Sequence, residues 1–252
     1  MSDNWDSYFC EVDGNPAAIL VDLDLAEAAP HAAFPYMGHI SVKACFPDRR
    51  GLPGQEEYER LGELEDALER ALTVDDQAVY VGRSAVDGHC DFFFYLRNGE
   101  HLGARAGAVM AAYPEYAWES GWQDDPGWQS YRSFLFPDDY ALNGIQNRRA
   151  LRELAEQGDD AQKSRTIEHW AVFDSPEAAV AFSRAVREEG FRPLPDERNP
   201  DLPEHLIGVC FSRPDAPEDI DAVTYPLVAL ALAHNGVYHG WACPVAPAVE
   251  EG

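Results

Sequence analysis

Two histidines in the second half of the chain are the side chains best suited to acid–base chemistry. His169 and His239 each lie in a predicted strand, and an imidazole titrates near neutral pH, so it can take or give a proton. No serine or cysteine in a nucleophile motif accompanies His169, which is followed by Trp170. We interpret His169 as a strand histidine that hydrogen-bonds to a neighbour, and we expect no catalytic residue in this half.

Metal and cofactor chemistry also lacks a supporting pattern. The eight histidines contain no pair at the i, i+4 spacing of a helical zinc site, and the five cysteines are widely spaced. The sequence has no phosphate-cradling glycine loop, dinucleotide fingerprint or serine elbow. We therefore expect neither a metal nor a cofactor.

One arginine of the first half is the best candidate for capturing an anionic ligand. Arg83 follows Tyr80-Val81-Gly82 at a predicted strand end, and a guanidinium can hold a carboxylate or phosphate at two points. Pairing with a local Asp or Glu is the alternative. Together with Glu57 and Tyr95, Arg83 forms the candidate ligand-binding set of an enzyme or small-molecule-binding protein, placed in the first half or in a cleft between the halves.

The overall charge restricts the partners that the chain can attract. Among its 252 residues, 45 are Asp or Glu and 19 are Lys or Arg, a formal net charge of −26. Such a surface repels nucleic acid and anionic membranes and attracts basic proteins, although the acids could serve solubility alone. The sequence has no long apolar run and begins without the pattern of a signal peptide. We expect a cytoplasmic protein with no membrane or direct nucleic-acid contact.

Hydrophobic periodicity predicts an α+β fold for the first half. The clearest helix spans 55–73, where leucines recur every three or four residues, and the aromatic run at 92–95 predicts a central strand covered on both faces. Strands are predicted at 5–12, 17–25, 38–46, 78–86, 90–96 and 116–123, and helices at 55–73, 100–112 and 128–136. This order predicts an antiparallel α/β sandwich.

The second half has a different order of elements. Proline and a carboxylate pair interrupt the periodicity at 137–140, which predicts two domains, 1–136 and 137–252. After a helix near 142–157, strands are predicted at 164–173, 191–194, 206–211 and 237–245, with helices at 176–189 and 217–235. This β-α-β-β-α-β order is typical of a ferredoxin-like plait.

Four short motifs of the second half carry a family resemblance. They are Gly158-Asp159-Asp160, Arg165 to Trp170, Glu189-Gly190-Phe191 and Tyr238-His239-Gly240-Trp241. With them the segment resembles the bacterial regulators of ribonuclease E activity, type B, which are ribonuclease E inhibitors. The resemblance implies an acidic αβ plait that binds the endonuclease. The sequence departs at His239, where the family usually carries Asp, so no role for that carboxylate is transferred.

The first half resembles an uncharacterised bacterial family, the domain of unknown function 695. The motifs that carry this resemblance are Gly51-Leu52-Pro53, Tyr80-Val81-Gly82-Arg83 and Phe93-Phe94-Tyr95. The family name implies no activity.

These observations predict a non-catalytic, acidic regulatory protein that binds a basic partner such as a ribonuclease. Acidic groups would dock on an arginine-rich segment of the partner, and aromatic groups would form part of the rim. The residues expected to face the partner are Asp159, Asp160, Glu168, His169, Tyr238 and Trp241. The alternatives are an enzyme or small-molecule-binding protein that uses Glu57, Arg83 and Tyr95, and an assembly protein that dimerises through a sheet edge.

Overall fold

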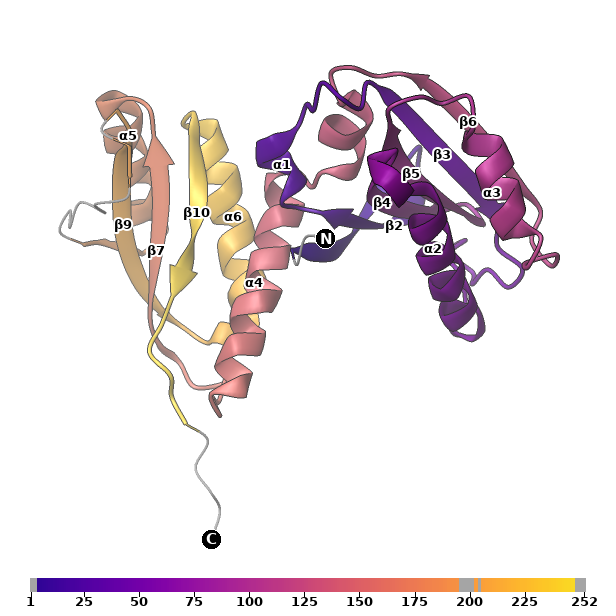
Figure 1. The fold of residues 1–252 in the computed structure, drawn as a ribbon. Coiled ribbons are helices and arrows are strands. Elements are labelled where there is room, and N and C mark those ends of the chain that lie inside the picture. Colours follow the sequence, from indigo (N-terminus) through magenta and orange to yellow (C-terminus); the bar gives the residue numbers. More distant parts are fainter. Residues whose placement is uncertain (1–3, 195–201, 204, 248–252) are drawn as a thin grey trace, which may run out of the picture. The chain divides into compact units, whose positions relative to one another are not determined.

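The chain folds into two units, each with one antiparallel sheet (Figure 1). The computed structural model describes residues 4–194, 202–203 and 205–247, and its packing divides the chain into Met1–Pro137 and Asp138–Gly252. The mixed content of helix and strand confirms the predicted α+β class. The two units are described separately below.

The first unit contains a six-stranded sheet in the order β1-β2-β4-β5-β3-β6. Its strands are β1 (Trp5–Val12), β2 (Asn15–Asp22), β3 (Tyr36–Lys43), β4 (Ala78–Val86), β5 (His89–Leu96) and β6 (Trp118–Asp124). Hairpins β1-β2 and β4-β5 turn at Asp13-Gly14 and Asp87-Gly88, where all four residues have positive φ. This is the conformation that Asp-Gly predicts in a two-residue hairpin.

Helical segments pack against this sheet, and two of them together cover one of its faces. The helical segments are α1 (Leu25–Ala28), η1 (Gln55–Glu57), α2 (Tyr58–Leu72), η2 (Val74–Asp76), α3 (Leu102–Met110) and the π-helical η3 (Tyr131–Leu135). In α2, the leucines at 61, 64, 68 and 72 are buried and pack with α3 against Phe92 and Phe94 of β5. Figure 1 shows α2 and α3 on this same face.

Strand β5 is buried on both faces, as the aromatic run predicts. Phe93 and Tyr95 point away from α2, and they contact Phe134 and Trp128 of the segment that contains η3. Phe92, Phe94 and Tyr95 are each 0% exposed. Large apolar side chains on both faces make this strand the centre of the first unit.

A β-bulge in β4 changes which side chains face α2. The register against β5 shifts between Tyr80 and Gly82, so Tyr80 and Arg83 reach the same face although three positions separate them. Both then contact Glu65 of α2, which accepts from the Tyr80 hydroxyl at 2.6 Å and pairs with Arg83 at 2.5 Å.

The second unit has the element order that its sequence predicts. After α4 (Asp139–Glu156), the elements are β7 (Arg165–Phe173), α5 (Pro176–Glu188), β8 (Arg192–Pro193), β9 (Ile207–Asp215), η4 (Pro217–Asp219), α6 (Ile220–Ala233) and β10 (Gly236–Ala242). The sheet order is β10-β7-β9-β8. The name ferredoxin-like plait stays an interpretation of this order, because β8 contributes only two residues.

Local signals set the helix starts in this unit. Ser175 caps α5 by accepting from the amide of Ala178 at 3.2 Å, and Pro176 occupies the first turn. Asp138 caps α4 by accepting from the amide of Ala141 at 2.8 Å. The carboxylate pair at 138–139 was expected to interrupt the hydrophobic periodicity. In the structure it starts a helix, because the N-cap position favours Asp.

Strand alternation divides the side chains of β7 between two faces. Ile167, His169, Ala171 and Phe173 are buried in the core formed with α5 and α6. Glu168 alternates with them and lies exposed on the other face. In β10 a bulge between Tyr238 and Gly240 leaves Tyr238 and Trp241 packed on the core, while His239 is exposed.

We predict that Gly82→Ala destabilises the first unit by about 2 to 4 kcal/mol. Gly82 has φ +154°, and a Cβ there would collide with the backbone oxygen of Leu20 on β2. Hydrogen exchange of the β4 and β5 amides measures this loss.

The matched control is Gly62→Ala in α2, where a Cβ meets nothing within 4 Å. This change should raise stability by about 0.5 to 1 kcal/mol, because alanine is the better helix former. Equal effects of the two substitutions would contradict the account of the bulge.

Candidate functional site

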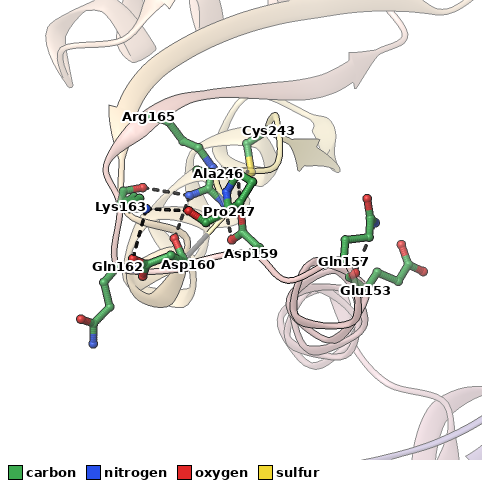
Figure 2. A network of polar contacts seen from close by, with 10 residues as sticks. All are labelled: Glu153, Gln157, Asp159, Asp160, Gln162, Lys163, Arg165, Cys243, Ala246 and Pro247. Carbon is green, nitrogen blue, oxygen red and sulfur yellow. Dashed lines mark hydrogen bonds and ion pairs between the residues drawn. The ribbon is translucent and has the colours of Figure 1, made fainter. Parts of the chain in front are cut away.

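The acidic turn predicted to meet a partner is held inside its own unit (Figure 2). Asp159 Oδ2 lies 2.6 Å from Arg165 Nη2, and Asp159 Oδ1 accepts from the amide of Ala246 at 2.6 Å. The side chain of Asp159 is 1% exposed and that of Arg165 is 9% exposed. These contacts correct the predicted docking role of Asp159, because a buried and paired carboxylate does not face a partner.

Arg165 joins this turn to the segment after β10. Its guanidinium donates to the carbonyl oxygens of Asp160 and Lys163, at 3.2 and 2.9 Å, and to Cys243 Sγ at 3.3 Å. Lys163 Nζ adds a 2.6 Å bond to the carbonyl oxygen of Pro247. Figure 2 shows these contacts converging from both segments. These bonds hold residues 243–247 against residues 159–165.

Asp160 and Glu168 retain some access to solvent, but they belong to different surfaces. Asp160 lies 3.7 Å from Lys163 and its side chain is 31% exposed, so this contact contributes little stability. Glu168 is exposed on the sheet face away from the helices. Both remain candidates for partner contact, although they do not form one cluster with Asp159.

His169 and Tyr238 form a buried polar pair. The Tyr238 hydroxyl lies 2.8 Å from His169 Nδ1, and the imidazole stacks on Phe211 and meets the edge of Phe191. Burial lowers the pKa of His169 from 6.5 to about 4 and raises that of Tyr238. These side chains are 0% and 7% exposed, so neither faces a partner, which corrects the prediction that both residues contact it. The expected hydrogen-bonded strand histidine is present.

Trp241 takes part in a polar network that the sequence analysis missed. Its indole Nε1 donates to Asn147 Oδ1 at 2.8 Å, and Asn147 Nδ2 donates to Thr224 Oγ1 and Asp221 Oδ1. Asn143, one turn earlier on α4, also donates to Thr224 at 2.8 Å. The network joins α4, α6 and β10, so Trp241 packs inward and is half-buried. The sequence signal that could have indicated this network is the pair Asn143 and Asn147, which lie at i, i+4 spacing on α4.

A groove lies beside α6 in the second unit, and the sequence analysis missed it too. It encloses about 300 Å³ and is lined by Glu189, Phe191, Arg213, Ala222, Val223, Pro226, Leu227 and Leu230. Arg213 lies over the Phe191 ring at 4.1 Å, pairs with Asp215 at 2.8 Å and donates to the Glu189 carbonyl oxygen. An apolar floor and a fixed guanidinium can hold a side chain of another polypeptide.

The ligand-binding set proposed for the first unit does not converge. Glu57 is 2% exposed and accepts from the amides of Cys45 and Phe46, at 2.8 and 3.0 Å. Tyr95 is 0% exposed, and its hydroxyl donates to Asp125 at 2.6 Å. Arg83 pairs with Glu65 on the opposite face of the sheet from Tyr95. The three side chains make their contacts in three separate parts of the unit. They form no common site, which corrects the prediction.

In residues 4–194, 202–203 and 205–247, no three His, Cys, Asp or Glu side chains gather in a way that could hold a metal ion. Within the same ranges, no helix combines the length and apolarity needed to cross a membrane.

Each part of the chain matches a family model. Residues 3–136 match the model of a family described as Family of unknown function (DUF695), and residues 144–243 match the model described as Regulator of ribonuclease activity B. The first match covers more than half of the chain, which therefore belongs to that family of unknown function. Both resemblances stated from the sequence are confirmed. The second match connects the chain with the regulation of ribonuclease activity.

Other comparisons add little. No curated protein matches the chain. A solved structure of an unknown protein from Galdieria sulphuraria is 13% identical, with the match covering 82% of this chain and 98% of that one. Its TM-score is 0.22, and we base no argument on it.

We predict that Asp159→Ala destabilises the second unit by about 3 to 5 kcal/mol, because it leaves Arg165 buried without its carboxylate. The matched change Asp160→Ala should cost no more than about 1 kcal/mol. Hydrogen exchange of the β7 and β10 amides in each variant measures both values. Similar small losses for the two variants would contradict the structural role of Asp159.

We also predict an acid-sensitive second unit. The folded pKa of His169 lies near 4, below the 6.5 of an exposed histidine, so the unfolded chain binds more protons between these values. Stability should therefore fall by about 3 kcal/mol as pH drops through this window. Tyr238 faces the imidazole, and Asp215 and Arg213 act on it electrostatically.

The test compares the parent protein with His169→Gln by amide exchange at several pH values. Carboxylates titrate in both proteins, so the difference between the two curves isolates the histidine. A difference that does not change between pH 6.5 and pH 4 would contradict its burial as a neutral group.

Proposed function

We propose that this chain is a non-catalytic protein that binds a ribonuclease through its second unit and restrains RNA cleavage. The observation that carries the proposal is the match of residues 144–243 to the family described as Regulator of ribonuclease activity B. The buried position of His169 supports a role other than catalysis, since a buried imidazole cannot reach a substrate.

The groove beside α6 is the proposed contact surface on the second unit. Leu227 and Leu230 line it, and Phe191 forms its wall under the fixed Arg213 side chain. Pro226 lies inside α6 and, with the exposed Ala222, lines the groove at one edge. The groove thus combines apolar surface with the fixed guanidinium of Arg213. Both suit an apolar side chain carried by another polypeptide.

The charge around the groove favours a basic segment of the ribonuclease. Arg213 is already paired with Asp215, while Glu189 lines the groove and is exposed. Glu218 and Asp219 are exposed in η4, which leads directly into α6. The proposed partner segment carries an apolar anchor between arginines or lysines, and the net charge of −26 steers it toward the protein. Masking of this basic segment would deprive the ribonuclease of a surface that holds RNA.

We predict that the full chain binds purified ribonuclease E and slows its cleavage of RNA. Binding measured without RNA should weaken steeply from low to high salt, because exposed charges are screened. Glu189→Lys should weaken binding by about fivefold to tenfold, since it reverses a charge at the rim of the groove.

The matched control is Glu156→Lys, which reverses an exposed charge on α4 outside the groove. It should leave the affinity nearly unchanged apart from the small effect of net charge. An equal loss in both variants would remove the groove from the proposal, and absence of any binding would contradict the proposed function.

A further inference from the structure

Strand β6 is an edge of the first sheet whose outer backbone groups are open. It pairs with β3 on one side and, among the described residues, with no strand on the other. The Lys43 amide donates to the Ala117 carbonyl oxygen at 2.9 Å, which makes 43 and 117 a hydrogen-bonded pair. Such pairs alternate along an antiparallel ladder. The N–H and C=O groups that point away from β3 therefore belong to Trp118, Ser120, Trp122 and Asp124.

The other sheet edges carry features that discourage pairing with another chain, whereas β6 is regular and open. Strand β8 contributes two residues, and β10 has a bulge before Gly240. On β1, the Ser7 amide donates to Asp6 Oδ1 at 2.8 Å. The register of β6 against β3 runs without a shift, and the strand contains neither proline nor lysine. This edge is therefore suited to receive another strand.

Two tryptophans lie along this edge and remain accessible. Trp118 lies beside Gly107 of α3, and Trp122 meets the Tyr36 ring edge-on at 5.4 Å. Trp118 and Trp122 nevertheless stay 37% and 47% exposed. They share one face of the strand with Ser120, because strand side chains alternate. Large aromatic side chains at an unpaired edge favour association with another chain.

We propose that β6 pairs with β6 of a second copy of this chain, antiparallel about a two-fold axis at Ser120. The spacing of the tryptophans selects this occupant, because Trp118 and Trp122 flank Ser120 at equal distance. The axis places Trp118 of each copy opposite Trp122 of the other, and Ser120 opposite itself. These are the outward-facing residues, so each pair exchanges two backbone hydrogen bonds and the tryptophans add cross-strand aromatic contacts. An axis at Gly121 would instead place Trp118 opposite Asp124.

The charges near the edge are compatible with this register. The three paired positions are uncharged, and Glu119 comes opposite Gly121 of the second copy on the other face. The net charge of −26 makes the copies repel each other at long range, so salt should strengthen the dimer by screening. The ribonuclease complex should weaken in salt, because its charges are unlike. The dimer interface belongs to the first unit and does not depend on the proposed function.

Sedimentation velocity of the full chain over a range of concentrations tests the dimer. The parent chain should dimerise, and added salt should raise the dimer fraction. Ser120→Pro should weaken dimerisation about tenfold or more, because proline removes an N–H that points away from β3 and makes no bond to it. Ser120→Ala is the matched control, since it keeps this N–H and should leave the association nearly unchanged. Exchange of the β4 and β5 amides verifies that the proline variant is folded.

Two charged variants locate the axis. Residue 120 faces itself in the proposed dimer, so Ser120→Asp and Ser120→Lys should each dimerise more weakly than the parent chain. An equimolar mixture of the two variants should restore dimerisation, because opposite charges then meet at the axis. With the axis at another residue, mixing would restore nothing.

Hydrogen exchange of the parent chain gives a readout at single residues. Concentrated protein should gain protection at the amides of Trp118, Ser120 and Trp122 relative to dilute protein. The amides of Glu119 and Gly121 face β3 and should exchange as before. Three outcomes would overturn the proposal: a parent chain that stays monomeric at every concentration, equal dimerisation of Ser120→Pro and the parent chain, and a mixture of the charged variants that forms no more dimer than either alone.

Discussion

The arginines hold this structure together from within the two units. Acids outnumber bases by 45 to 19, and several arginines are committed to internal contacts. Arg165 ties Asp159 and Cys243 together, Arg213 is fixed between Asp215 and Phe191, and Arg83 is paired with Glu65. Because these cations serve internal acids, exposed carboxylates elsewhere keep the outside of the chain negative. The pairing of arginines with internal acids thus stabilises each unit and also leaves the surface negatively charged.

This constraint changes where a basic partner can bind. Asp159, a carboxylate that was expected to dock on the partner, has an arginine and a backbone amide as its own partners. Partner contact is left to carboxylates at the surface, such as Glu189 at the groove beside α6 and Glu168 on the opposite face of the sheet. The groove adds apolar surface, which charge alone does not provide, and this combination gives specificity as well as attraction.

Periodicity predicted the elements well, because leucines at helical spacing and Asp-Gly turns act locally, as α2 and the β4-β5 hairpin show. The candidate sites depended on features that periodicity does not contain. The bulge at Gly82 brings Arg83 to Glu65, and the bulge at Tyr238 keeps both Tyr238 and Trp241 on the core. The outward direction of the Trp118, Ser120 and Trp122 amides follows from the pairing of β6 with β3, two strands far apart in the sequence. Each such feature is set by long-range register, which a single sequence does not reveal.

The most direct test of the central claim is hydrogen exchange of the full chain with and without ribonuclease E. If surface carboxylates around the groove receive the basic segment, the new protection should appear at residues 189–191 and 213 and along α6. The amides of 159–165 and 243–246 should exchange as before, because their partners lie within the same unit. New protection confined to the 159–165 turn, with none along α6, would contradict the account.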